Sequence, residues 1–387
     1  MKKVAIVSCY FKKNYGSLLQ AYATQKILDK LNIENETINI DENIDFKKGK
    51  KKFYKSQILN FPFIKSKIGM IKLKLDRKVN KKLNKNLEIR EKKFEEFRNK
   101  FRLTKPFTTY EEIAQQCENY SDVLVGSDQL WLPVNVVSDY YTLNWVPNNI
   151  NKVSYATSFG ISSIPKKYYD KYRKFLSRID FISVREKNAC ELVKDISGKD
   201  AELVCDPTLL LNKKEWLEIQ EEKPIVKGNY ILCYFLGKNI EHRKFAEKLK
   251  ERTGYKIVSI NHCDEYVKYS DKFADEIPYN IGPGEFINLI RNAKYVCTDS
   301  FHGTVFSLIN KVNFFTFERF AGKNIKMSTN SRIYSLLELV ALEERLIKES
   351  NQLEKKINEN INYDKVDDVI ENFRQTSIEF LKQALLD

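Results

Sequence analysis

Short apolar runs that end in small or polar residues recur along this chain, and most of them lead into a helical pattern. The first run spans residues 4–9 and is rich in β-branched side chains. A helix is predicted over 18–31 and a second strand over 36–40. Strand, helix and strand in this order form a βαβ unit, whose two strands lie parallel in one sheet. The pattern therefore restricts the chain to the α/β class.

The same alternation continues in two further blocks. Strands are predicted at 121–126, 153–157, 181–184 and 203–205, and then at 230–236, 255–260, 293–298 and 312–317. Residues 208–229 connect the two blocks, and 387 residues exceed what a single hydrophobic core usually supports. We therefore predict two Rossmann-like domains that face each other across a cleft, formed by residues 1–207 and 208–387. An amphipathic helix predicted at 364–385 braces them.

The composition, with 42% hydrophobic residues, is that of a globular protein, and no apolar run approaches the ~20 residues of a membrane span. The apolar run near the N-terminus meets Lys12 and Lys13 without a small-residue cleavage site. We therefore interpret it as a core strand and predict a cytoplasmic protein. The seven cysteines lack the paired spacing of zinc or redox motifs, and we predict no metal and no cofactor.

The positive charge is concentrated in one segment. Between residues 47 and 105 there are 22 Lys and Arg against 5 Asp and Glu, so this segment carries +17 and the rest of the chain −3 of the overall +14. We predict a helical insertion at 46–105, with a break at Pro62 and one or two amphipathic helices from residue 68. The favoured interpretation is a solvated lysine face over a helix that caps the sheet; the alternative is contact with an anionic surface, such as a membrane carrying lipid-linked glycan. Because the basicity is local, no nucleic-acid partner is predicted.

The turn after the predicted strand at 293–298 is the strongest candidate for a functional site. Asp299, Ser300, His302 and Gly303 follow the strand, and an apolar helical run begins at Thr304. In open α/β sheets, ligands bind at the carboxyl edge of the strands, where this histidine is expected. A capped helix start with an exposed histidine is the alternative explanation of the same residues.

Polar residues also follow the other predicted strands. Asn14, Gly16 and Ser17 lie in the first strand-to-helix turn, where a sugar or phosphate can meet a helix N-terminus. This turn is not the G-x-G-x-x-G pattern of nicotinamide and flavin proteins. In a parallel sheet the carboxyl ends of all strands lie at the same edge. The polar residues that follow the other strands are therefore expected there, among them Asp128, Gln129, Arg185, Arg319 and Arg332.

Six sequence blocks together resemble the polysaccharide pyruvyl transferase family. They are Asn-Tyr-Gly-Ser at 14–17, Gly-Ser-Asp-Gln-Leu-Trp at 126–131, Tyr-Ala-Thr-Ser-Phe-Gly at 155–160, Ser-Val-Arg-Glu at 183–186, Asp-Pro-Thr at 206–208 and Asp-Ser-Phe-His-Gly-Thr at 299–304. They occur in family order over about residues 1–345. The resemblance implies a GT-B-like fold. It also implies transfer of a pyruvyl group from phosphoenolpyruvate onto the hydroxyls of a surface polysaccharide or its precursor, forming a cyclic ketal.

This chemistry gives the predicted residues their roles. Phosphoenolpyruvate carries a phosphate and a carboxylate, which arginines can bind in a bidentate manner. His302 suits general acid–base work near neutral pH. His242 is predicted to be solvated on a charged helix, and His262, which ends a strand, is a further candidate to line the cleft. We assign donor binding to Arg185, Ser300, Gly303, Thr304, Arg319 and Arg332, and acceptor binding to Asn14, Gly16, Ser17, Asp128 and Gln129.

One position departs from the family pattern. Better-understood pyruvyl transferases that resemble this chain carry an arginine two positions before the histidine, where this chain has Ser300. A glycosyltransferase of GT-B type that uses a nucleotide sugar or another anionic donor is therefore a second hypothesis. A third is a non-catalytic adaptor that holds a glycan-synthesis complex at the membrane through the basic segment. No Asp-x-Asp metal motif is evident, so neither of the two transferase hypotheses requires a divalent ion.

Overall fold

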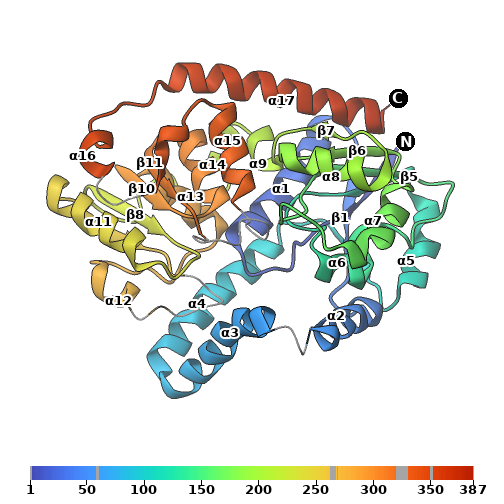
Figure 1. Ribbon diagram of the computed structural model, residues 1–387, viewed down its shortest axis with the longest axis horizontal. Helices are drawn as coiled ribbons and strands as arrows, with labels where there is room; N and C mark the ends of the chain where they lie inside the picture. The colour runs from blue at the N-terminus through green and yellow to red at the C-terminus, as the bar shows by residue number, and fades with distance from the viewer. Residues whose placement is uncertain are drawn as a thin grey trace.

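The computed structural model describes residues 2–57, 61–261, 267, 269–319, 330–348 and 352–386. Its two sheets follow one another along the chain (Figure 1). The first has the order β3-β2-β1-β4-β5-β6-β7, and every neighbouring pair is parallel. Its strands are β1 Lys3–Val7, β2 Glu34–Asn39, β3 Leu103–Pro106, β4 Asp122–Val125, β5 Asn151–Thr157, β6 Phe181–Val184 and β7 Glu202–Leu203.

The second sheet has the order β12-β11-β10-β8-β9 and is also parallel throughout. Its strands are β8 Tyr230–Tyr234, β9 Lys256–Ser259, β10 Tyr295–Thr298, β11 Asn313–Phe317 and β12 Leu346–Ile347. The interior strands β1, β4, β8 and β10 carry few exposed side chains, as expected for sheets covered by helices on both faces. The predicted α/β class and the two Rossmann-like units are confirmed. The boundary at residues 207 and 208 stays a prediction.

Helices connect the strands of both sheets. In the first unit they are α1 Tyr15–Lys30, α2 Ile44–Ser56, α3 Phe61–Val79, α4 Lys81–Arg98, α5 Tyr110–Gln116, α6 Pro133–Ser138, α7 Tyr169–Leu176, α8 Lys187–Ser197, α9 Pro207–Leu210 and α10 Lys213–Leu217. In the second they are α11 Ile240–Thr253, α12 Ser270–Phe273, α13 Pro283–Arg291, α14 Phe301–Asn310, α15 Ser331–Leu339, α16 Leu353–Lys356 and α17 Tyr363–Leu385. Short 3-10 turns lie at Cys117–Asn119, Tyr140–Thr142, Lys166–Tyr168 and Glu343–Arg345.

The basic insertion is helical, as predicted, and its later part forms two helices. Helix α3 begins at Phe61, so Pro62 lies in its first turn, where a missing backbone N–H is tolerated. Asn80 separates α3 from α4 and caps α4, because its side chain accepts a hydrogen bond from the backbone N–H of Leu83. Figure 1 shows α3 and α4 extending away from the two sheets.

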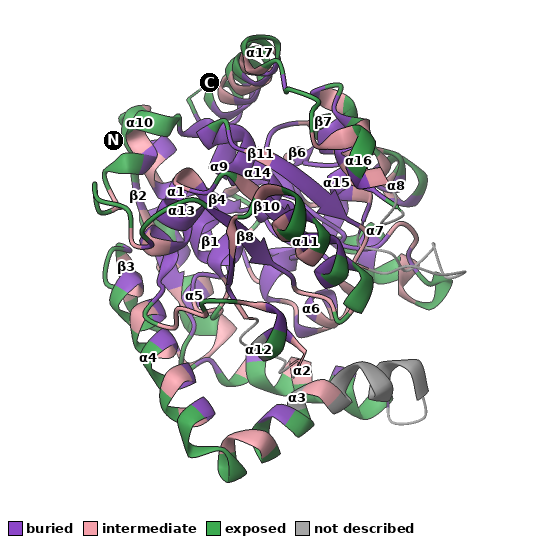
Figure 2. Cartoon of the chain, turned by 90° about the vertical axis from the view of Figure 1, so that its left-hand side faces the viewer, coloured by how far each residue is buried: buried purple, intermediate pink, exposed green. Residues whose placement is uncertain are grey.

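The two units share a continuous apolar core. One buried cluster includes Val4 and Leu124 of the first sheet together with Leu232 and Val296 of the second. At its centre the ring of Tyr15 on α1 stacks on Phe286 of α13, with centroids 4.6 Å apart and an angle of 8° between the planes. Figure 2 shows the strands of both sheets buried between their helices. This core fixes how the carboxyl ends of the two sheets meet.

The predicted C-terminal helix is confirmed as α17, which runs along both units (Figure 1). Ile370 and Leu381 on α17 belong to the shared core. The hydroxyl of Ser377 accepts a hydrogen bond of 2.9 Å from the backbone N–H of Cys205, just beyond β7. Within the described part of the chain, no helix combines the length and the apolar character that crossing a membrane requires.

Candidate active site

His302 occupies the first turn of α14, at the carboxyl end of β10. Ser300 is the N-cap residue, and its hydroxyl accepts a hydrogen bond of 3.3 Å from the N–H of Gly303. Gly303 is required here, because a Cβ at this position would lie 2.5 Å from the hydroxyl oxygen of Thr298. The turn therefore has the predicted capped start, but its histidine is 7% exposed and points into the protein rather than into solvent.

The imidazole of His302 lies between two elements of the first unit. A Cβ on Gly16, in the first turn of α1, would lie 2.0 Å from Nδ1 of His302, so the ring rests against the glycine backbone. On its other side, Nε2 lies 3.6 Å from a carboxylate oxygen of Asp206, within ion-pair reach but longer than a hydrogen bond. Nε2 is buried and has no hydrogen-bond partner among the described residues.

A buried ion network surrounds this contact. The guanidinium of Arg185 has 1% of its side-chain surface exposed and pairs with the carboxylates of Asp206 and Asp128. Burial raises the pKa of Asp206, but the charges of His302 and Arg185 lower it more, so the carboxyl stays ionised. Burial likewise opposes the charge of Arg185, and its carboxylate neighbours raise its pKa above the ordinary value. Arg185 is thus held by carboxylates of its own chain.

Asp128 joins the network from the turn after β4, with a φ of +84°, which non-glycine residues rarely adopt. Its carboxylate accepts hydrogen bonds from the hydroxyl of Ser17 at 2.7 Å and the thiol of Cys9 at 3.3 Å, and Lys12 lies 3.6 Å away. Burial raises the pKa of Asp128, but the charges of Lys12 and Arg185 hold it well below the usual value. The strained backbone places an ionised carboxylate beside the N-terminus of α1.

Glu186 is the carboxyl group in this cluster whose pKa is raised. It follows β6, is 3% exposed, and accepts a hydrogen bond of 2.7 Å from the hydroxyl of Ser158 through Oε1. Its Oε2 is buried without a hydrogen-bond partner. Burial raises the pKa of Glu186, and the charges of Arg185 and Arg332 offset this only in part.

Two arginines at the edge of this network form no ion pair with a carboxylate of the described residues. Arg332, in the first turn of α15, is 6% exposed, and its buried Nε has no hydrogen-bond partner among those residues. Its guanidinium lies over the ring of Phe301, 5.6 Å from the centroid. Burial and the charge of Arg185 lower the pKa of Arg332 to about 9. Glu186 and Asp128 raise the pKa of Arg332 but do not offset its burial, and this incompletely compensated cation favours binding of an anion.

Arg319 lies directly after β11 and is half-buried. Its Nε is also buried without a hydrogen-bond partner, and it pairs with no carboxylate of the described chain. Its Cγ would be 3.2 Å from a Cβ on Gly237, in the turn after β8, and its charge contributes to the lowered pKa of Arg332. The two arginines therefore flank the start of α14 from neighbouring elements.

A cavity reaches this cluster from the side. It has a volume of about 30 Å³ and is lined in part by Arg185, Asp206, Phe301 and Arg332. A space of this size holds water rather than a phosphorylated three-carbon acid. A donor therefore needs movement of the surrounding side chains or of the two units.

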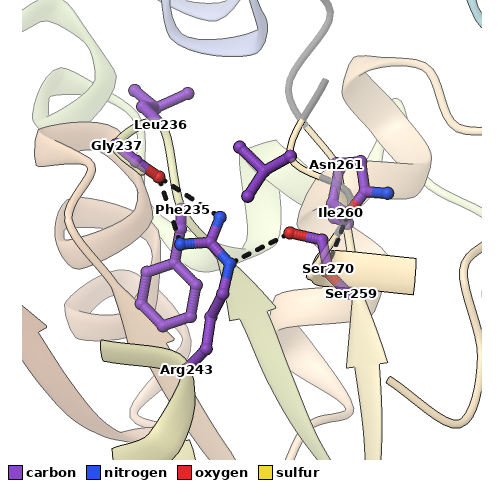
Figure 3. A pocket seen from close by; sticks show the side chains of 9 residues that line it. Phe235, Leu236, Gly237, Arg243, Ser259, Ile260, Asn261 and Ser270 are labelled. Carbon is purple, nitrogen blue, oxygen red and sulfur yellow. Dashed lines mark hydrogen bonds between the residues drawn. The ribbon is translucent and has the colours of Figure 1, made fainter. Parts of the chain in front are cut away.

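A second polar pocket lies at the carboxyl ends of β8 and β9 (Figure 3). Its buried arginine, Arg243, donates hydrogen bonds to the carbonyl oxygens of Gly237 and Asn239 and to the hydroxyl of Ser270. The carboxylate of Asp299 accepts hydrogen bonds from the backbone N–H groups of Leu236 and Gly237, at 2.6 and 2.8 Å. These groups tie the turns of the second sheet together, and the pocket volume is only about 10 Å³.

The prediction that His242 is solvated is wrong. His242 on α11 is 6% exposed, and its ring lies 4.6 Å from that of Phe317. Burial lowers the pKa of His242 to about 4, so it is neutral at physiological pH. Of its charged neighbours in the sequence, Glu241 and Lys244 are exposed, whereas Arg243 is also buried. His262 lies outside the described residues.

The remaining predicted residues occupy helix starts and turns. Asn14 caps α1 by accepting a hydrogen bond from the N–H of Ser17, and Gln129 is half-buried against Gly160. Thr304 is fully buried, and its hydroxyl bonds to the carbonyl of Ser300 and the hydroxyl of Thr316. The structure thus gathers Gly16, Ser17, Asp128, Arg185, His302 and Arg332 in one cluster, whereas the side chain of Thr304 points into the core.

Sequence reasoning did not assign site roles to Asp206, Glu186 and Lys12. Asp206 and Glu186 stand in blocks that carried the family resemblance, and Lys12 follows the first strand. All three are polar residues that follow a predicted strand, and this pattern could have identified them. In the part of the chain that the structure describes, no three His, Cys, Asp or Glu side chains form a metal-binding group.

Comparison with known proteins identifies a family and a fold. A sequence model of the family described as polysaccharide pyruvyl transferase matches residues 14–319. No protein with a curated description matches the sequence. Among solved structures, UDP-GlcNAc 2-epimerase from Methanocaldococcus jannaschii aligns with a TM-score of 0.51 and 14% identity over 96% of this chain and 92% of the epimerase chain. The same enzyme in complex with UDP-GlcNAc and UDP aligns with a TM-score of 0.50 and 14% identity over 97% of this chain and 100% of the other. These likenesses support the predicted GT-B-like fold.

Proposed function

The chain belongs to the polysaccharide pyruvyl transferase family, an enzyme family, and we propose that it transfers a pyruvyl group from phosphoenolpyruvate to a sugar of a cell-surface polysaccharide or its precursor. The observation that carries the choice of donor is the pair Arg332 and Arg319, which flank the start of α14 and form no ion pair with a carboxylate of the described residues. Phosphoenolpyruvate presents two anionic groups on a small frame. One guanidinium for each group provides charge-assisted hydrogen bonds.

The reaction balances without a cofactor. A sugar hydroxyl adds to C2 of phosphoenolpyruvate as C3 takes up a proton, and the C2–O bond to phosphate breaks. A second hydroxyl of the same acceptor then closes the cyclic ketal. Two hydroxyl protons leave the sugar: one ends on the new methyl group and the other on inorganic phosphate. The products are the ketal and phosphate.

His302 is the proposed acid–base residue. Its unbonded Nε2 can take a hydroxyl proton or deliver one to C3. Asp206, 3.6 Å from Nε2, is a positioning residue that stabilises the imidazolium while Gly16 holds the opposite side of the ring. Arg185 keeps Asp206 ionised and in place. In this proposal Arg185 therefore supports the site rather than clamping the donor, and Arg332 compensates for the arginine that the family pattern has at Ser300.

The acceptor is proposed to lie on the α1 side of His302. Asn14, Gly16, Ser17, Asp128 and Gln129 surround the first strand-to-helix turn, and the Asp128 carboxylate can accept hydrogen bonds from sugar hydroxyls. We place the enzyme in the cytoplasm at the inner face of the membrane, where a lipid-linked glycan would present its sugar. The basic helices at 46–105 are the proposed contact.

A donor titration tests this function. Phosphoenolpyruvate should raise the Tm of the wild-type protein, and Arg332→Gln should weaken its binding by roughly 10–100-fold, as expected for a lost charge-assisted contact. Arg252→Gln, which removes an exposed charge on α11, is the matched control and should bind normally. Phosphate release with glycan acceptors then measures transfer, and His302→Ala should lower kcat by roughly 10²–10⁴-fold. Absence of any Tm shift with phosphoenolpyruvate would overturn the donor assignment.

A second candidate is a glycosyltransferase of GT-B type that uses a nucleotide sugar or another anionic donor. Ser300 in place of the family arginine favours it, and so does the fold shared with an epimerase that binds UDP-GlcNAc and UDP. The same Tm titration with UDP-sugars separates the two, because stabilisation by a UDP-sugar and none by phosphoenolpyruvate selects this alternative. Membership of a transferase family gives no support to the hypothesis of a non-catalytic adaptor.

A further inference from the structure

Helix α3 presents an apolar ridge to solvent. Ile71, Leu75 and Val79 are spaced four residues apart and are 60%, 57% and 86% exposed. Residues four apart lie on one face of a helix. The favoured interpretation of the sequence was a helix that caps the sheet beneath a solvated lysine face. In the structure these three apolar side chains of α3 are exposed instead.

A different face of α3 makes the contacts with α4. Leu73 packs with Leu83 and Leu87 of α4, and Arg77 donates hydrogen bonds to Asn84 and Glu91 of the same helix. Helix α4 is in turn anchored to the second unit, because Lys93 pairs with Glu285 at 2.8 Å. The contacts of the described side chains of α3 therefore do not involve the ridge.

Lysines border the ridge on both sides. With 3.6 residues per turn, Lys74 and Lys78 fall on one side of the ridge and Lys72 on the other. All three are exposed, and none forms an ion pair with a described residue. Three side-by-side apolar side chains between unpaired lysines are the pattern of a helix that lies in the plane of a membrane interface.

We propose that the α3 ridge of Ile71, Leu75 and Val79, with its bordering lysines, docks the enzyme on a bilayer that contains anionic lipids. The apolar side chains enter the headgroup region, and the lysines pair with the lipid phosphates. A soluble polyanion or a nucleic acid would use the lysines but leave the ridge exposed. A second copy of the chain would bring like charges together. This inference rests on the proposed function, in which the basic helices contact the membrane. Its test measures vesicle binding and not pyruvyl transfer, so the docking surface and the proposed reaction can each fail independently.

Vesicle co-sedimentation of the full chain tests the proposal. Wild-type protein should bind phosphatidylcholine vesicles that contain phosphatidylglycerol and not vesicles of phosphatidylcholine alone. The triple change Ile71→Ser, Leu75→Ser, Val79→Ser should weaken binding by at least 100-fold. The triple change Lys72→Gln, Lys74→Gln, Lys78→Gln should weaken it by roughly 100-fold. The matched control Lys166→Gln, Lys171→Gln, Lys174→Gln removes the same charge from exposed positions around α7 and should bind within about twofold of wild type.

The outcomes separate the possible partners. Loss of binding in the lysine variant with normal binding in the ridge variant indicates attraction to any polyanion and overturns the proposal, as does the absence of vesicle binding by the wild type. Leu75→Trp gives an independent measure of docking, because it does not rely on a variant that has lost binding or stability. Its fluorescence should be quenched by brominated anionic lipid to a greater extent than that of the wild type. In the wild type Trp131 and Trp216 are fully buried, and the half-buried Trp145 packs against Tyr110 and Tyr140 of the first unit.

Discussion

Glu186 shows how one buried carboxyl group adjusts the charge of the site. Its neighbours Asp128 and Asp206 are ionised by close cations, whereas burial dominates at Glu186 and raises its pKa. In the unfolded chain a glutamate titrates near about 4.3. As the pH rises past that value, the unfolded state loses this proton before the folded state does. Stability therefore falls with rising pH until the pH passes the folded pKa.

We predict that Glu186→Gln raises the Tm at pH 7 by a few degrees and leaves it nearly unchanged below pH 4. The amide keeps the hydrogen bond to Ser158 while removing a carboxylate whose ionisation opposes folding. Thermal melts across this pH range measure the effect. Glu191→Gln, at an exposed position of α8, the helix that Glu186 precedes, controls for loss of one negative charge. A Tm gain at pH 4 as large as that at pH 7 would show that the carboxylate is not the cause.

Gly16 is a residue whose missing side chain creates the site. We predict that Gly16→Ala lowers transfer activity at least tenfold, because the new methyl group would lie 2.0 Å from Nδ1 of His302 and displace the ring. Alanine is favoured over glycine in helices by about 1 kcal/mol, so weakening of α1 cannot explain a loss. Gly126→Ala is the control, because its Cβ would meet its nearest atom at an ordinary 3.8 Å. Steady-state kinetics with wild-type kcat in Gly16→Ala would contradict this placement of the ring.

At the scale of elements, α17 stabilises the fold through its apolar face and through one hydrogen bond to the first unit. We predict that Ser377→Ala lowers the free energy of unfolding by about 1–3 kcal/mol, because the buried N–H of Cys205 loses its acceptor. Thr376→Ala, on the exposed face of the same helix, should change stability far less. Chemical denaturation measures both variants. Equal effects would assign the loss to helix propensity instead.

The sequence predicted the positions of helices and strands better than it predicted which face of each helix is buried. The strand at 181–184 has the predicted bounds, and β10 begins two residues later than expected, because apolar runs between polar turns mark buried strands clearly. The ridge on α3 and the ring of His242 were assigned to the wrong surroundings. Periodicity identifies a face of a helix, but the partner of that face depends on how distant elements pack.

At the scale of the molecule, the candidate site required information that no local pattern contains. His302 was predicted from its turn, but its neighbour Asp206 belongs to the other unit, and their 3.6 Å approach depends on how the two sheets are joined. The joint is the shared core around Tyr15, Phe286 and Trp216. The ends of the predicted strands show which residues lie at the carboxyl edge of each sheet. The packing of the core between the two units determines which of these side chains come into contact.

A core shared in this way predicts that the two units unfold together. Calorimetry should show one transition whose van't Hoff and calorimetric enthalpies agree, although 387 residues and two sheets would allow two transitions. Phe286→Ala removes a ring that stacks on Tyr15 and should destabilise the protein by about 3–5 kcal/mol. Hydrogen exchange would then show β4 and β10 losing protection to the same extent, although the substituted residue lies in the second unit. Loss confined to β10, or two separate transitions, would mean that the units are only docked, and the placement of Asp206 against His302 would then depend on a movable interface.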